Sequence, residues 1–252
     1  MNLGSLLIDI SQKIGKKLKF TDQTLHGALN NNWVVKDKEE KKYVLRIPKE
    51  NPPQIPLIRD EYEIIGYAKN GSKYRFRTSE EQFSFTEKCF LSGIPVPRTS
   101  YSDNKAILRE FIEGTTLDNF LKKTNNTSVI EDYLKTIVKA HEKGIILGDR
   151  WGPNTIVAPE KNLVEIDFDI DLTAEDAREF EIAQILSYCL LWSRNKTGAI
   201  KSIIDLVNSD KFDGFYDGCR ISEFLHGHEE YFRKKEFGSI KREVENIIFC
   251  LK

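Results

Sequence analysis

Residues 148–154 read GDRWGPN and residues 164–169 read VEIDFD, and the fold is decided by what surrounds these two stretches. Apolar residues recur at three- and four-residue spacing over 129–143, which predicts a helix ahead of the first stretch. Two short runs between the stretches predict a β-hairpin, with strands at 155–158 (TIVA) and 163–167 (LVEID). We therefore expect Asp149 and Asn154 in a loop and Asp167 at the end of a strand.

These three residues have the chemistry that phosphoryl transfer requires. Asp149 lies five residues before Asn154, where its carboxylate can accept or orient the proton of an attacking hydroxyl. The amide oxygen of Asn154 and the carboxylate of Asp167 are hard oxygen ligands that suit Mg²⁺ against phosphates. The alternative is turn chemistry alone, because Asp and Asn both bend loops.

Outward from this centre, the first third of the chain is rich in strand patterns. Residues 32–36 and 42–47 predict a hairpin, and 73–77 and 105–111 predict further strands. Thr78 or Ser79 caps a helix that should run to about Ser92. From Gly114 onward the pattern is mainly helical. We expect an α+β protein with two lobes, an antiparallel sheet plus helix at 1–112 and a mostly helical lobe at 113–252.

Composition excludes several classes of protein. The net charge is −1 and the pI is about 6.5, which gives no electrostatic footprint for nucleic acid. No run of about 18 apolar residues predicts a membrane span. The N-terminus is too polar for a signal peptide, and the four cysteines contain no C-x-x-C pair. We expect a cytoplasmic protein with reduced thiols.

The two stretches resemble the catalytic loop and metal-binding motif of the protein-kinase-like superfamily. They are most similar to the aminoglycoside-phosphotransferase and choline-kinase branch, whose loop typically reads H-G-D-x-x-x-x-N. The resemblance extends over residues 26–47, 81–97 and 107–117. It implies a two-lobed enzyme that uses ATP and Mg²⁺, or Mn²⁺ in its place, to move the γ-phosphate to a hydroxyl of a small-molecule acceptor.

The resemblance also implies roles for individual residues in the first lobe. Arg46 occupies the place of the phosphate-binding lysine, with Lys49 as the alternative cation, and Gly27 and Asn31 belong to the nucleotide loop. The helix acid that pairs with Arg46 is predicted to be Glu81. Counting back from Pro95 reaches Gln82, and rival acids are Glu61, Glu63 and Glu87. The interlobe hinge, whose backbone would meet adenine, is Glu110, Phe111 and Ile112.

Several residues depart from the family pattern. Leu147 replaces the histidine before Gly148, and Trp151 stands where protein kinases use a phosphate-neutralising lysine, which Arg150 could replace. Asp169 replaces the glycine of the D-F-G motif, where it or Asp171 either assists the metal or lies at the surface. A predicted helix from about Thr173 leaves no room for an activation segment, on which protein substrates dock.

That missing segment favours a small acceptor, but two alternatives stay open. One is an atypical protein kinase of the RIO type, which would act on serine or threonine. The other is a pseudokinase that binds nucleotide or acts as a scaffold. This alternative stays open because the nucleotide loop contains only one glycine, Gly27, and because the helix acid that pairs with Arg46 is uncertain. His226 and His228 are interpreted as a surface helix end, since no third metal ligand has suitable spacing.

Overall fold

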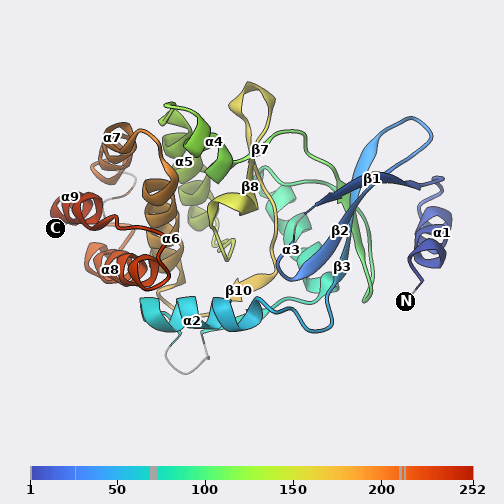
Figure 1. The fold of residues 1–252 in the computed structure, drawn as a ribbon, viewed down its shortest axis with the longest axis horizontal. Coiled ribbons are helices and arrows are strands. Elements are labelled where there is room, and N and C mark those ends of the chain that lie inside the picture. The colour runs from blue at the N-terminus through green and yellow to red at the C-terminus, as the bar shows by residue number, and fades with distance from the viewer. Residues whose placement is uncertain (1, 26, 69–72, 210–211, 213, 252) are drawn as a thin grey trace.

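The computed structural model describes residues 2–25, 27–68, 73–209, 212 and 214–251. A five-stranded antiparallel sheet occupies one part of the molecule, and most helices gather in the other (Figure 1). The strands are β1 (Lys19–Leu25), β2 (Asn30–Lys36), β3 (Lys42–Pro48), β4 (Tyr74–Phe76), β5 (Thr99–Ser102), β6 (Ile107–Glu110), β7 (Thr115–Thr116), β8 (Thr155–Val157), β9 (Leu163–Glu165) and β10 (Ile170–Leu172). The α-helices are α1 (Leu3–Lys13), α2 (Ile55–Ile65), α3 (Ser79–Leu91), α4 (Leu117–Lys123), α5 (Ser128–Glu142), α6 (Ala177–Trp192), α7 (Lys196–Val207), α8 (Gly218–Lys234) and α9 (Lys241–Cys250).

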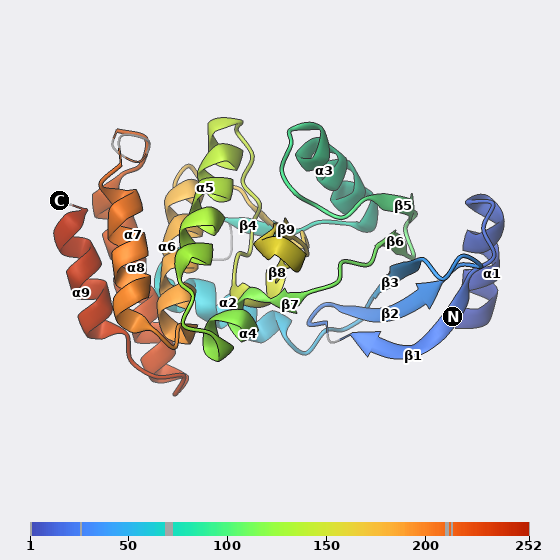
Figure 2. The ribbon, with the colours of Figure 1, turned by 90° about the horizontal axis from the view of Figure 1, so that it is seen from above.

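The two faces of the large sheet have different environments. Its strands pair in the order β1-β2-β3-β6-β5, with Leu45 opposite Trp33 and Leu108. Because side chains alternate along a strand, Leu45 and Arg46 point to opposite faces. The Leu45 face forms a buried core with α1, which Figure 2 places at one end of the molecule. The Arg46 face stays available for polar contacts with the C-terminal part.

Helix α3 begins with the capping signature that its sequence predicts. The Thr78 hydroxyl accepts the backbone N–H of Glu81, and the Glu81 carboxylate accepts the backbone N–H of Thr78. This reciprocal pair satisfies two donors that a helix start leaves unpaired. The predicted helix is confirmed, as are the hairpin of β2 and β3 and the strands β4 and β6.

The C-terminal part is built around α6. Almost every residue of this helix is buried, because α4, α5, α7 and α8 all pack against it. The apolar side chains of these helices belong to one large core. The predicted helix over 129–143 is confirmed as α5, and the predicted hairpin between the two stretches is confirmed as β8 and β9.

Two elements from the first 112 residues reach across to the C-terminal part. Helix α2 packs against α8 and runs along the lower edge of Figure 1, and β4 pairs with β10. The division at residue 112 therefore stays a prediction about lobes, since contacts of these two elements cross it. None of the helices in the described residues is long and apolar enough to cross a membrane.

Candidate active site

The backbone around Asp149 is fixed by two side chains of α6. Glu181, fully buried, accepts the N–H of Gly148 at 2.7 Å, and its other oxygen lies 2.5 Å from Nε2 of His141. One residue on the other side, the N–H of Arg150 donates to Oε1 of Gln184 at 2.7 Å. Loop residues held on both sides in this way have a defined position, as a reacting group requires.

The Asp149 side chain has two donors of its own. Nε2 of Gln184 donates to its Oδ1 at 2.8 Å, and the Tyr62 hydroxyl lies 3.4 Å from the same oxygen. Burial raises the pKa of Asp149 to about 6, although the Arg150 guanidinium and the Gln184 hydrogen bond act against that rise. A partly exposed carboxylate with a pKa near neutrality can serve as a general base.

Arg150 joins this loop to the segment that carries Asp167. Its fully buried guanidinium donates to the carboxylate of Glu165 at 3.0 Å and to the backbone carbonyls of Asn154, Ile166 and Asp167. An arginine committed to these acceptors does not reach out to a phosphate. The suggestion that Arg150 replaces the phosphate-neutralising lysine is therefore wrong, and its role is to hold two segments together.

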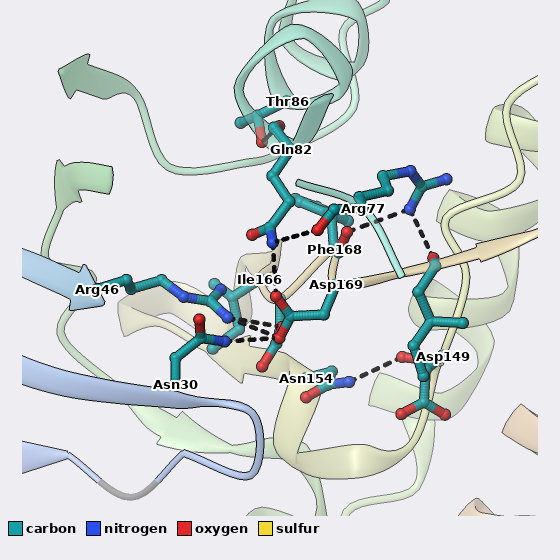
Figure 3. Close-up of polar contacts among 12 residues, drawn as sticks. Asn30, Arg46, Arg77, Gln82, Thr86, Asp149, Asn154, Ile166, Phe168 and Asp169 are labelled. Carbon is teal, nitrogen blue, oxygen red and sulfur yellow. Dashed lines mark hydrogen bonds and ion pairs between the residues drawn. The ribbon is translucent and has the colours of Figure 1, made fainter. Parts of the chain in front are cut away.

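Asn154 and Asp167 lie on these joined segments. Nδ2 of Asn154 donates to the backbone carbonyl of Asp149 at 2.8 Å (Figure 3), which leaves its amide oxygen free of that contact. The N–H of Ile166 donates to the carbonyl of Asn154 at 2.9 Å. Asp167 has a positive φ of 65°, an uncommon backbone conformation for a non-glycine residue that is often found at functional sites.

Arg46 reaches this segment from the sheet. Its Nη2 lies 3.0 Å from Asp167 and 2.8 Å from Asp169, and Figure 3 shows it meeting Asp169. Two amides also converge on Asp169, because Nδ2 of Asn30 donates at 2.8 Å and Nε2 of Gln82 donates at 2.7 Å. Asp169 is buried at the centre of this network, so the surface interpretation of Asp169 is wrong.

The predicted pairing of Arg46 with Glu81 is also wrong. Glu81 lies on the exposed side of α3, where it caps Thr78 and pairs with Arg75 at 2.6 Å. Helical residues one position apart point in directions about 100° apart, so only Gln82 of this pair faces inward. Asp171 forms ion pairs with Arg75 and Arg77.

The two aspartates of this network have opposite pKa shifts. Although burial acts against it, the Arg46 charge and a hydrogen bond with Asp169 hold the pKa of Asp167 well below its usual range. Burial raises the pKa of Asp169 to about 7, with the Asp167 charge adding to the rise and Arg46 opposing it. Asp167 is therefore the ionised partner, which is the state that a metal ligand needs.

The β1–β2 connection lies beside a pocket of about 390 Å³. The predicted loop residues Gly27 and Asn31 both line it, together with Asn30, Asn32 and Lys49. Nζ of Lys49 donates to the carbonyls of Gly27 and Ala28. Lys49 thus closes the loop rather than standing ready as the alternative phosphate cation.

The predicted hinge residues follow β6. The N–H of Glu110 donates to the carbonyl of Arg98, and the N–H of Phe111 donates to the carbonyl of Lys42. Within the described residues, the N–H of Ile112 has no such backbone partner. Contact of this backbone with a nucleobase stays a prediction.

The oxygen ligands present fit a magnesium ion that is shared with phosphates. In the part of the chain that the structure describes, no group of three or more His, Cys, Asp or Glu side chains forms a metal cluster. Magnesium is usually held by one or two protein oxygens together with phosphate oxygens and water. Asp167 and Asn154 could supply those protein ligands.

Comparisons with known proteins bear on this geometry. No family model matches the chain. A segment of 103 residues is 30% identical to the EKC/KEOPS complex subunit bud32 of Dictyostelium discoideum, covering 36% of this chain and 41% of that relative. The chain thus spans about two fifths of the length of this curated relative.

Solved structures match over the whole chain. The ADP/Mg²⁺-phosphoaspartate complex of the Rio2 kinase from Chaetomium thermophilum has a TM-score of 0.54 at 14% identity, over 99% of this chain and 75% of that one. A second Rio2 structure from the same organism has a TM-score of 0.55 at 13% identity, over 100% and 78%. This chain has a protein-kinase-like fold. The predicted kinase-like fold and its two-lobed α+β class are confirmed.

Within the protein-kinase-like fold, the acid that meets the β3 cation comes from an unexpected place. Protein kinases usually take it from a helix of the first lobe, whereas here Asp169, two residues after Asp167, contacts Arg46. Gln82 of α3 occupies the position of that helix acid and donates a hydrogen bond to Asp169. Two features of the sequence indicate this arrangement. Asp169 replaces the glycine of the D-F-G motif, and the position reached by counting back from Pro95 is Gln82 rather than an acid.

A second group that sequence reasoning missed stands beside Asp149. Glu61 of α2 accepts a hydrogen bond from the Tyr188 hydroxyl at 2.8 Å. Burial raises the pKa of Glu61 to about 8, the Asp149 charge adds to the rise, and the hydrogen bonds of Tyr188 and Gln184 oppose it. The sequence indicates Glu61 only as a rival partner for Arg46, and nothing local in the sequence indicates that α2 crosses to α8.

Proposed function

We propose that this protein is an ATP- and Mg²⁺-dependent phosphotransferase that moves the γ-phosphate to a hydroxyl of a small-molecule acceptor. The observation that carries the proposal is the arrangement of three side chains. Arg150 ties the loop of Asp149 and Asn154 to the segment of Asp167. Kinase-like folds perform phosphoryl transfer largely by positioning and electrostatic stabilisation, and this arrangement supplies both.

In this proposal, Asp149 orients the acceptor hydroxyl and takes its proton as the oxygen attacks the γ-phosphorus, while the bond from that phosphorus to the β–γ bridging oxygen breaks and ADP leaves. Its pKa of about 6 leaves it mostly ionised at neutral pH, so it can accept that proton. Asn154 and Asp167 would hold Mg²⁺, which supplies neutralisation of the phosphate charge. Arg46 braces Asp167 through their 3.0 Å ion pair. The nucleotide would lie between the sheet and these residues, with its base at residues 110–112.

The segment after Asp167 supports a small acceptor. Residues 170–172 pair with β4, and Thr173 donates its N–H to the carbonyl of Lys73. Helix α6 begins soon afterwards, at Ala177. A segment so occupied offers no extended surface on which a protein substrate could dock.

Phosphate transfer to a protein is the second candidate, favoured by the similarity to Rio2 kinase structures. Incubation with γ-labelled ATP, Mg²⁺ and a mixture of hydroxyl metabolites distinguishes the two. Label in a metabolite supports the proposal, whereas label found only on protein supports the second candidate. Nucleotide binding without any transfer would support a pseudokinase.

The same assay tests Asp149. The Asp149→Asn variant keeps the shape of the side chain and removes the base, so we expect transfer to fall by about 10²-fold or more. The Asp171→Asn variant is the matched control, because Asp171 pairs with Arg75 and Arg77 rather than with Arg46. Transfer by Asp149→Asn at the wild-type rate would remove Asp149 from the mechanism.

A further inference from the structure

Arg109 of β6 carries a buried charge that has no hydrogen-bond or ion-pair partner within the described residues. Its side chain is 9% exposed, and within the described residues it makes no hydrogen bond and no ion pair. A guanidinium withdrawn from water without a partner costs free energy. Such a group in a folded protein therefore calls for an explanation outside the chain's own contacts.

The register of the sheet shows which way this side chain points. Arg109 stands opposite Val44, and Arg46 lies two residues along the same strand as Val44. Cross-strand partners share a face, and so do residues two apart. Arg109 therefore lies on the face of Arg46 and Asn30, which meets Asp167 and Asp169.

Arg109 and Arg46 differ in what a ligand can reach. Nη2 of Arg46 is shared by two aspartates, and its Nε and Nη1 are fully enclosed without a hydrogen-bond partner among the described residues. The side-chain nitrogens of Arg109 make no hydrogen bond within the described residues either, but none of them is among the fully enclosed atoms that lack a partner. The donors of Arg109 thus keep some contact with the outside, while those of Arg46 do not.

The charges around Arg109 indicate an anion. Burial lowers the pKa of Arg109 to about 9, and the neighbouring Arg46 charge adds to that effect, while Asp167 and Asp169 oppose it. A metal held by Asp167 would make this region more positive still. A polyphosphate would neutralise both the metal and the free guanidinium, which an uncharged base edge could not do.

We propose that Arg109 is the cation that binds the phosphates of the nucleotide, while Arg46 braces the two aspartates. This inference rests on the proposed function and changes which arginine contacts the ligand. Its geometry is bidentate donation from a planar guanidinium to phosphate oxygens. Arg109 belongs neither to the sequence motifs described above nor to the residues that line the pocket beside the β1–β2 connection.

Calorimetric titration of adenosine, ADP and ATP into wild type and Arg109→Leu tests the proposal. We expect the variant to bind ADP and ATP about tenfold or more weakly, because it loses charged hydrogen bonds, and to bind adenosine as the wild type does. Arg109→Lys should keep part of the affinity. Arg98→Leu is the control, since Arg98 is exposed at the sheet edge.

Thermal unfolding without nucleotide adds a second readout. Arg109→Leu removes an unpaired buried charge, so its midpoint should lie at or above that of the wild type, whereas its shift on adding ATP should shrink. Equal ATP affinity in both proteins would overturn the inference and leave the proposed function standing. Weakened adenosine binding, or a switch of preference towards GTP, would assign Arg109 to the base and also overturn it. A wild type that binds no nucleotide would remove the proposed function itself.

Discussion

At the scale of single residues, the acids around Asp149 and Asp167 are distinguished by their neighbours. Asp167 meets a cation, and the pKa of its carboxyl is lowered, whereas Glu61 and Asp149 lie close to each other, and the pKa of each is raised. Pairs of titratable groups whose environments separate their pKa values are common in active sites. The same contrast makes a prediction about stability.

Replacing Glu61 by Gln should make the protein's stability less sensitive to pH. The pKa of Glu61 is about 8 in the folded state against an ordinary value of 4.5. Its neutral form therefore contributes stability that is complete below about pH 4.5 and is lost as pH rises through 8. We expect the free energy of unfolding of Glu61→Gln, relative to wild type, to increase between pH 5 and pH 9 by about 1 kcal/mol or more.

Urea unfolding at both pH values measures this difference. Glu63→Gln is the matched control, because Glu63 lies on the exposed side of the same helix. A constant difference between Glu61→Gln and wild type across the range would contradict the raised pKa of Glu61.

The residues that could be predicted from the sequence are those within one short stretch. The nearness of Asp149, Asn154 and Asp167 along the chain could be predicted, because loop and hairpin spacing fixes it. The partner of Arg46 could not be found in this way, because Asp169 lies 123 residues further along the chain. The positions of Glu61 and Arg109 could not be predicted either. Packing of α2 brings Glu61 to the site, and the register of the sheet brings Arg109 there.

At the scale of elements, the loop that carries Asp149 depends on its close approach to β10. Gly148 has a φ of +103°, and a Cβ built there would lie 2.2 Å from the carbonyl oxygen of Ile170. Gly144 has a φ of +66° and no heavy atom within 4 Å of such a Cβ. Replacing each of the two glycines by alanine therefore separates the free-energy cost of steric overlap from that of backbone conformation.

We expect Gly148→Ala to lower the free energy of unfolding by about 3 kcal/mol or more, through both strain and overlap. Gly144→Ala should cost about 1–2 kcal/mol, through backbone conformation alone. Chemical denaturation of the two variants measures the difference. Similar costs would show that the loop does not rest against β10.

The helices and strands that could be predicted are those with clear local patterns in the sequence. Helices α3 and α5 were predicted well because a capping box and a clear apolar spacing mark them. Strand β10 was missed because its three residues, Ile170–Leu172, include a charged side chain and pair with a distant strand. Short strands of this kind are stabilised by their partners rather than by their own sequence.

At the scale of the whole molecule, α2 and β4 connect the sheet's part of the chain to the helical part. Helix α2 brings Glu61 to Asp149, and β4 pairs with the strand that follows Asp167. The fold class could be predicted because strand patterns precede helical ones. The packing of α2 against α8 could not be predicted, because the sequence of a short helix after several prolines does not indicate which element it will contact.

The central claim is that Asp167 and Asn154 hold Mg²⁺ against the phosphates of ATP. Calorimetric titration of ATP with and without Mg²⁺, into wild type and Asp167→Asn, tests it most directly. We predict that Mg²⁺ tightens ATP binding to wild type by about tenfold or more and leaves the variant nearly unchanged, with Asp171→Asn as a control that behaves like wild type. An equal gain from Mg²⁺ in wild type and Asp167→Asn would contradict the account.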